Sequence, residues 1–393
     1  MAVAQLALSL YLPSLPALAK HFQVSPSFIQ ASLTTFITAF ACSQFFYGSL
    51  SDRFGRRPIL LLGLAITILG TIIIIFSSTV YGFFLGRFIE GLGAGALPLL
   101  SRAIIRDKFE GMDLTLGMSY LVMFASLTPA IAPFIGGYIN DRFGWRVVFI
   151  FLLLYSLVAV VNVLFFLPES KKAGKVNISV RNTIKHFKYL LSNKIFIGNV
   201  ICIIMAYACQ LIYQSISPFI FQNQMHLSSA SYGELIMLPA VGFLVGNLIF
   251  NRFVKYVKNY YLLLIGDIIL ILSGAALIIE HLFAIVSITA IIIPITTAIL
   301  GIGFIYPDVV NGALQPFAAI AGTASSLSGF LQVVGSGVLL SLLNYNHVIS
   351  SPGLGISLFL CGIVILLTTI FLIIPMSGTF LVPSKKKLKQ KPN

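Results

Sequence analysis

The stretch G-S-L-S-D-R-F-G-R-R-P, from Gly48 to Pro58, places a dense cluster of charge between two long apolar runs. The cluster holds four charged residues within six positions: Asp52, Arg53, Arg56 and Arg57. Only 9% of the 393 residues are charged, so the cluster differs sharply from its surroundings. Gly48 and Gly55 indicate positions that need a tight backbone. The stretch predicts a short polar turn between two long apolar helices.

The composition of the whole chain is that of an integral membrane protein. Hydrophobic residues make up 58% of the sequence and the mean hydropathy is +1.00, whereas soluble domains are about 45–50% apolar and about 25% charged. A net charge of +14 would suggest a nucleic-acid partner in a soluble protein. Here the basic residues lie between apolar runs, so we expect a lipid bilayer and no nucleic acid as the partner.

Twelve apolar runs are long enough to cross a bilayer, which takes about 20 residues. They fall at 2–19, 29–50, 58–78, 81–105, 113–138, 145–167, 195–221, 230–251, 260–279, 282–305, 317–343 and 353–376. We predict an all-α membrane protein of twelve transmembrane helices in two six-helix halves. The halves are residues 1–168 and 195–378, joined by a cytoplasmic linker at 169–194 and followed by a basic tail at 379–393.

The distribution of Lys and Arg predicts the orientation. With a cytoplasmic N-terminus, 21 of the 25 basic residues fall in cytoplasmic loops or the tail, three fall on the other side, and Arg87 lies within a span. Basic residues concentrate on the cytoplasmic side of membrane proteins. We therefore expect both termini in the cytoplasm. The linker is amphipathic in places, which favours a position on the membrane surface as much as a solvated linker.

The first apolar run resembles a signal peptide only at its end, where Ala17-Leu18-Ala19 imitates a cleavage site. No basic residue precedes the run, and Pro13 and Pro16 interrupt it. We therefore expect a membrane span and not a signal peptide. Since the run is short for a span, we also expect that this chain lacks the cytoplasmic start of its first helix.

Residues for enzyme chemistry or cofactor binding are scarce. The five histidines lie in loops or at span ends, away from other metal ligands, and the sequence has no Gly-rich phosphate loop. The four cysteines lie within apolar runs without zinc spacing, so we expect them to be core residues. We predict no metal, no organic cofactor and no enzyme activity.

Three ionisable residues lie deep within predicted spans, where charge is costly and often functional. Arg87 and Glu90 share one helix face in L-G-R-F-I-E-G-L-G-A-G, and Asp267 lies alone in the ninth span. A guanidinium favours the charged carboxylate, and apolar surroundings favour the neutral acid. We predict that these three residues couple transport to protons. The alternative for Arg87 and Glu90 is a static ion pair that holds helices together.

Other polar and small residues mark a predicted cavity and a predicted moving interface. Residues expected to line a substrate cavity are Tyr11, Gln44, Tyr120, Tyr207, Gln210, Tyr213, Gln214 and Gln332. An aromatic cavity with few charges would accept lipophilic cations, although each of these side chains could also be a packing residue. In the fifth span, Pro129, Pro133, Gly136 and Gly137 combine helix kinks with a small face.

Several motifs together resemble one transporter family. The Gly48–Pro58 stretch resembles the signature loop of the major facilitator superfamily, and T-P-A-I-A-P-F-I-G-G resembles the helix motif of its drug:proton antiporter branch. The runs S-R-A-I-I-R-D-K-F, D-R-F-G-W-R-V-V-F and L-P-E-S are similar to the Bcr/CflA drug-resistance family. The resemblance covers essentially the whole chain and is less specific for the substrate.

The resemblance implies two halves that rock around a central cavity. It also implies that Asp52 faces a helix N-terminus of the other half, that Arg53 and Arg56 bridge to neighbouring acids, and that Arg87 in the cavity wall takes part in proton coupling. Relatives often carry glutamine at the position of Glu90, which suggests that the titratable site has moved to the fourth span.

We therefore predict a monomeric, proton-coupled exporter of small amphipathic compounds in the bacterial inner membrane, driven by the proton gradient. Two alternatives stay open: an exporter of one metabolite, such as an amino acid or a sugar, and a transport-incompetent sensor or scaffold. A membrane enzyme is the weakest alternative, because the histidines and acids form no catalytic set.

Overall fold

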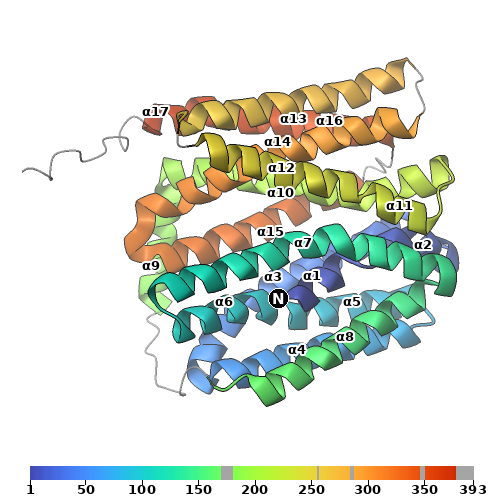
Figure 1. The fold of residues 1–393 in the computed structure, drawn as a ribbon, viewed down its shortest axis with the longest axis horizontal. Coiled ribbons are helices and arrows are strands. Elements are labelled where there is room, and N and C mark those ends of the chain that lie inside the picture. Colours follow the sequence, from blue (N-terminus) through green and yellow to red (C-terminus); the bar gives the residue numbers. More distant parts are fainter. Residues whose placement is uncertain (170–179, 255, 284–286, 346–349, 378–393) are drawn as a thin grey trace, which may run out of the picture.

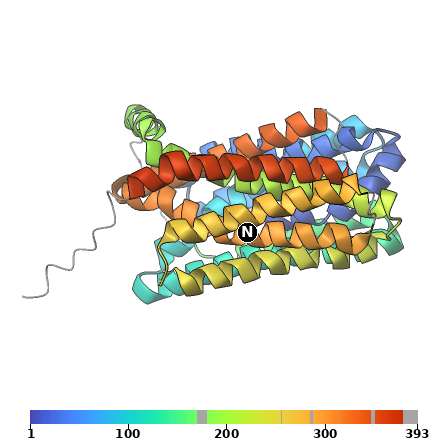
Figure 2. The ribbon, with the colours of Figure 1, turned by 90° about the horizontal axis from the view of Figure 1, so that it is seen from above.

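The protein is a bundle of long helices that run back and forth along one axis (Figures 1 and 2). The computed structural model describes residues 1–169, 180–254, 256–283, 287–345 and 350–377. The predicted tail at 379–393 and part of the predicted linker lie outside these residues. The domain boundaries stay predictions.

The first half contains α1 (Ala2–Ser9), η1 (Leu12–Ser14), α2 (Leu15–Phe22), α3 (Pro26–Phe54), α4 (Arg56–Phe76), α5 (Val80–Ala94), α6 (Ala96–Lys108), α7 (Gly111–Phe143) and α8 (Trp145–Phe166). The helix α9 (Val180–Ser192) follows. The second half contains α10 (Lys194–Phe219), η2 (Ile220–Gln224), α11 (Ser229–Leu235), α12 (Met237–Phe253), α13 (Asn259–Leu282), α14 (Ile288–Leu314), η3 (Gln315–Ile320), α15 (Ala321–Tyr345), α16 (Ser351–Thr368), η4 (Thr369–Ile373) and α17 (Ile374–Ser377).

Ten helical segments within the described residues are long and apolar enough to cross a membrane. They match ten of the twelve predicted spans. The other two predicted spans correspond to α3 and α7, which contain 29 and 33 residues and lie among the other long helices (Figure 1). That these two also cross the membrane stays a prediction.

Local sequence sets where many of these helices begin and break. Side chains at the N-cap accept backbone N–H bonds at the start of α3, α5, α10, α11, α14 and α16, from Ser25, Thr79, Asn193, Ser228, Ser287 and Ser350. Pro13 and Pro16 lack an N–H, and the first span is accordingly divided into α1, η1 and α2.

The turn predicted at Gly48–Pro58 is much shorter than expected. The helix α3 continues to Phe54 and α4 begins at Arg56, so Gly55 alone forms the connection, with a φ of +97° that glycine adopts readily. The expectation that Gly48 needs a tight backbone is wrong here. Gly48 lies inside α3, and a Cβ atom added to it would meet nothing within 4 Å.

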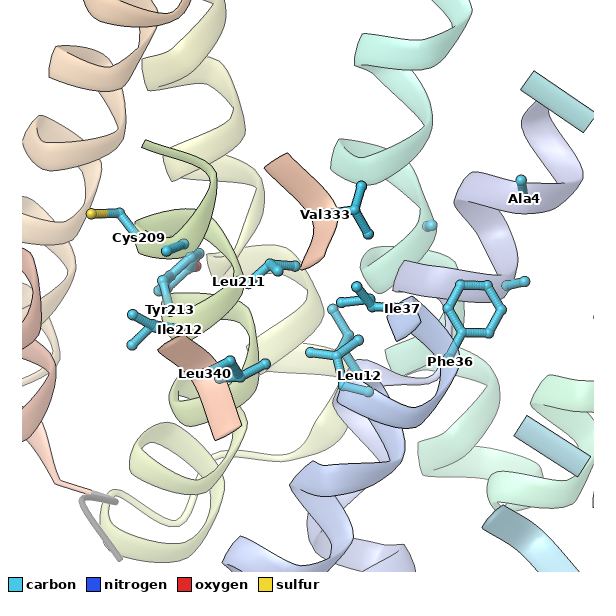
Figure 3. Packing of buried hydrophobic residues seen from close by; sticks show 14 of the residues in the cluster. Ala4, Leu12, Phe36, Ile37, Cys209, Leu211, Ile212, Tyr213, Val333 and Leu340 are labelled. Carbon is cyan, nitrogen blue, oxygen red and sulfur yellow. The ribbon is translucent and has the colours of Figure 1, made fainter. Parts of the chain in front are cut away.

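The two halves meet along several pairs of helices. The helix α3 packs against α15, α7 packs against α11 and α12, and α10 packs against η1 and α2. We name the two ends of the bundle the Gly55 end and the Gln23 end, after the turns α3–α4 and α2–α3. The apolar part of this contact includes Leu12 and Ile37 of the first half, which face Leu211 and Val333 of the second (Figure 3).

Candidate functional site

Arg87 and Glu90 form a fully buried ion pair on α5, one turn of helix apart. Arg87 Nη1 donates to Glu90 Oε2, and both side chains are 0% exposed. The second carboxylate oxygen, Glu90 Oε1, lies 3.0 Å from the hydroxyl of Thr71 on α4. The pair predicted from sequence therefore exists, and a hydroxyl from the neighbouring helix completes it.

The break in the first span supplies a further partner for Arg87. Because α1 ends at Ser9, the carbonyl of Ala7 is among the last four of its helix, which lack regular intrahelical partners. Arg87 Nη1 donates to this carbonyl over 2.9 Å. The guanidinium also lies over two aromatic rings, 4.2 Å from the centroid of Tyr11 and 4.3 Å from that of Phe36. Residues of α1 and α3 and Tyr11 thus surround a guanidinium on α5.

Small residues bring α4 close enough to α5 for this contact. A Cβ atom on Gly70 would collide with the backbone of Glu90, and one on Gly93 would collide with the backbone of Thr67. The two helices therefore touch almost backbone to backbone. Thr71, next to Gly70, is placed beside the Glu90 carboxylate as a result.

The chemistry of this arrangement bears on the charge of Glu90. A carboxylate in an apolar interior stays charged only while a cation and hydrogen bonds compensate it. Arg87 and Thr71 provide that compensation for Glu90. Movement of α4 against α5 would remove the hydrogen bond from Thr71 and so favour the neutral acid.

Asp267 lies elsewhere, within the second half. It is on α13, is 0% exposed and has no hydrogen bond to either carboxylate oxygen among the described residues. The structure therefore does not bring the three predicted coupling residues together. Whether any of them couples transport to protons stays a prediction.

The predicted gating turn is held by a cluster of charges centred on Arg56. Its guanidinium lies 2.9 Å from Asp52 Oδ1 and 2.9 Å from Asp107 Oδ2, and donates to Ser51 Oγ over 2.5 Å. The bridge expected from Arg56 to neighbouring acids is confirmed. Arg53 is exposed and lies 5.2 Å from the Phe54 ring centroid, and the described residues show no ion pair for it.

Glu169 caps the helix that follows the turn. Its Oε1 accepts from the backbone N–H of Arg56 over 2.8 Å, and its Oε2 accepts from that of Arg57 over 3.1 Å. These are the first two N–H groups of α4, which have no partner within the helix. A negative charge is favoured at this position by the helix dipole. Arg57 in turn donates to the carbonyl of Leu164 over 2.6 Å.

The proline–glycine motif lies at the contact between the halves. Pro129 and Pro133 are inside α7, which continues unbroken to Phe143. A Cβ atom on Gly136 would collide with the carbonyl of Leu10, and one on Gly137 would collide with the carbonyl of Ser229 on α11. The small face predicted for this helix therefore allows close contact with both halves.

The residues predicted to line a substrate cavity do not form one cluster. Tyr11 is buried beside Arg87, Tyr213 is buried within the second half, and Tyr120 is 60% exposed. Gln44 and Gln210 are half-buried, and Gln214 is buried with an unpartnered Oε1. Tyr207 and Gln332 lie near each other through Tyr306, whose hydroxyl donates to Gln332 Oε1 over 3.1 Å.

Sequence reasoning did not find several partners in these sites. Thr71, Phe36, Asp107, Glu169 and Tyr306 each complete a contact described above. Asp107 and Glu169 belong to the conspicuous motifs R-D-K and L-P-E-S, so a signal for them was available. Thr71 and Phe36 are ordinary residues of apolar helices, and nothing in the sequence distinguishes them.

The comparisons with known proteins agree on one family. The model of the Major Facilitator Superfamily matches residues 1–340. The chain is 28% identical to "Multidrug resistance protein D" (EmrD) of Escherichia coli K12 over 366 residues, which cover 93% of this chain and 92% of the relative. It is also 28% identical to the "Bicyclomycin resistance protein homolog" of Haemophilus influenzae, over 85% of this chain and 84% of the relative.

A solved structure shows the same fold. The crystal structure of a D-xylose-proton symporter superposes with a TM-score of 0.76 at 17% identity, and the match covers 98% of this chain and 97% of the symporter. Together with the ten apolar helices, these matches make the protein a multi-pass membrane protein and confirm the predicted fold class. The chain belongs to the Major Facilitator Superfamily.

Proposed function

We propose that this protein is a proton-coupled multidrug exporter, which moves small amphipathic compounds out of the cell while protons move in. The observation that carries the proposal is the buried pair of Arg87 and Glu90. It supplies a carboxylate whose charge depends on a single cation within a superfamily of transporters. The names of the relatives, which include multidrug and bicyclomycin resistance, support the substrate class.

The pair suggests how proton binding changes the helices. While Glu90 is charged, Arg87 is held between Glu90 on α5 and the Ala7 carbonyl on α1. When Glu90 binds a proton, the ionic contact is lost, and Arg87 keeps only the carbonyl and the two aromatic rings. The constraint on the Arg87 side chain, which also contacts α1, therefore differs between the two states. Linkage then requires that the proton and the drug affect each other's binding.

The substrate would bind between the halves, near Tyr207, Tyr306 and Gln332. These side chains come from α10, α14 and α15, which belong to the second half and include two helices of the interface. Aromatic rings and neutral polar groups suit varied lipophilic compounds, including cations. Gln44, Gln210 and Gln214 remain predicted contributors to this site.

The remaining parts of the proposal concern location and energy source. We place the protein in the bacterial inner membrane as a monomer, with both termini and the Gly55 end in the cytoplasm, because basic residues concentrate at that end. The gradient of protons drives transport, with no metal, organic cofactor or chemical reaction. The Asp52–Arg56 turn then acts as a cytoplasmic gate.

The test is transport in proteoliposomes with an imposed pH gradient, with ethidium as the probe. We expect the wild type to accumulate ethidium and Glu90→Gln to lose accumulation by about tenfold or more, while it keeps downhill exchange of ethidium. Gln can still accept from Arg87, so the fold is expected to persist. Glu234→Gln, which makes the same change at an exposed acid, is the control.

Three outcomes would contradict the proposal in different ways. Full gradient-driven accumulation of ethidium by Glu90→Gln would show that Glu90 is not the residue that binds the transported proton. Transport of a single metabolite and of no dye would identify a specific exporter. The absence of any flux in the wild type, with the protein correctly folded, would favour a sensor or scaffold.

A further inference from the structure

Asp267 is a buried carboxyl group without a compensating partner. It lies in the middle of a buried face of α13 and is 0% exposed. Neither Oδ1 nor Oδ2 has a hydrogen-bond partner, and no ion pair involves it among the described residues. Glu90, by contrast, is equally buried but has a guanidinium and a hydroxyl. The charge of Glu90 is therefore compensated, whereas a charge on Asp267 would not be.

The surroundings of Asp267 come from three packed segments of the second half. Leu263 and Leu270, one turn before and after it on α13, are both 0% exposed. Thr369 of η4 lies beside the carboxyl group, is also 0% exposed, and its hydroxyl has no hydrogen bond. Cys202 of α10 lies near both. Two unsatisfied polar groups thus face each other inside an apolar core.

The titratable groups named near Asp267 are thiols and a carboxyl group, and none of them is a base. Cys202 of α10 lies within electrostatic range of Asp267, and it also lies within range of Asp308 of α14. Cys361 of α16 lies against Cys209 instead. Asp308 is half-buried and accepts from the exposed Asn259 over 2.8 Å at the Gly55 end. Nothing among the described residues supplies a positive charge, so an ionised Asp267 would stay uncompensated.

We infer that Asp267, beside Thr369, forms a binding site for one proton that is buried within the second half. An uncompensated carboxylate is strongly disfavoured in an apolar interior, and binding a proton removes the charge. The Thr369 hydroxyl can donate to the carboxylate or accept from the neutral acid, so the proton is needed to remove the charge and not to satisfy Thr369. The bound proton therefore stabilises the packing of α10, α13 and η4.

This site differs in kind from the Arg87–Glu90 pair. Both sites take their groups from one half, but Asp267 has no cation that could compensate its charge once the proton leaves, whereas Glu90 has Arg87. We therefore expect the proton at Asp267 to be required for stable packing and not to be carried across the membrane. The inference does not depend on the proposed function, because it concerns the folded state alone.

The test is thermal unfolding of the full chain in detergent, followed by far-UV circular dichroism, between about pH 6 and about pH 9. We expect the melting temperature of the wild type to fall by roughly 5 °C or more as the pH rises, since the unfolded chain carries this acid charged throughout the range. Asp267→Asn, a neutral mimic, should keep the acidic-pH value across the range. Glu234→Gln should behave like the wild type.

Further readouts separate this inference from its alternatives. The infrared spectrum at acidic pH should contain a neutral carboxylic acid band that Asp267→Asn lacks. The inference is wrong if the wild type and Asp267→Asn lose stability in parallel, or if Na⁺ but not choline raises the melting temperature of the wild type at alkaline pH. It is also wrong if Asp267→Asn, with normal stability, loses gradient-driven ethidium transport, because Asp267 would then be a coupling residue.

Discussion

Arg87 contacts its surroundings in three chemically different ways, all of its hydrogen bonds coming from Nη1, while Nε and Nη2 have no hydrogen-bond partner among the described residues. It forms an ion pair with Glu90, donates to the Ala7 carbonyl and lies over the rings of Tyr11 and Phe36. Each contact comes from a different element, so Arg87 also joins α1, α3 and α5.

Removal of Arg87 alone should lower the free energy of unfolding more than removal of both Arg87 and Glu90. Arg87→Leu leaves Glu90 buried without a cation, and the loss of one partner of a buried pair costs about 3–5 kcal/mol. In the double variant Arg87→Leu with Glu90→Leu, no charge remains, so we expect stability to recover in part. Thermal unfolding of the purified variants measures both values. Equal losses in the single and the double variant would show that the ionic contact contributes little to stability.

At the scale of the element, the turn between α3 and α4 depends on two features. Gly55 takes a positive φ, and Glu169 caps the first two N–H groups of α4. A Cβ atom at Gly55 would lie 2.7 Å from Glu169 Oε2, so the cap and the turn occupy the same space. The turn is therefore sensitive to any side chain at position 55.

Two alanine substitutions within the same motif should have opposite effects. We expect Gly55→Ala to lower stability by about 1–3 kcal/mol, because it combines a strained φ with a displaced cap. Gly48→Ala should be neutral or stabilise by up to about 1 kcal/mol, because Gly48 is within a helix with open space around it. The melting temperatures of the two variants provide the comparison. A loss for Gly48→Ala would mean that another conformation uses that space.

At the scale of the whole molecule, hydrogen bonds join the two halves at the Gln23 end. Gln30 donates to the Ser215 carbonyl over 2.8 Å, and Asn140 donates to Ser229 Oγ over 2.8 Å. Gln222 donates to the Pro13 carbonyl over 2.8 Å. Because Gly137 also lets α7 and α11 touch, this end of the bundle is closed in the present conformation.

A reversible crosslink at this end should stop the transport cycle. Asn140→Cys and Ser229→Cys, combined with Cys42→Ser to remove the exposed native thiol, place two thiols where the native side chains already touch. We expect oxidation to lower ethidium transport by about tenfold or more, and dithiothreitol to restore it, because the halves must separate here during the cycle. Either single cysteine variant is the control. Undiminished transport in the crosslinked protein would show that this end does not open.

The features that the sequence by itself determined are those that depend on neighbouring residues. Apolar runs of membrane length, the prolines that break the first span and the charge cluster before Pro58 are all local patterns, and the helices follow them. The pair of Arg87 and Glu90 was also predictable, because residues three positions apart on a helix lie next to each other on its surface.

Only the tertiary structure decided which groups surround those charges. Thr71 reaches Glu90 because two helices touch at glycines, and Ala7 reaches Arg87 because the first span breaks. The extent of α3 through Phe54 and the isolation of Asp267 likewise depend on packing. The rotation of one helix against another is set by contacts between distant residues, so hydropathy places a residue within the membrane without revealing its partners.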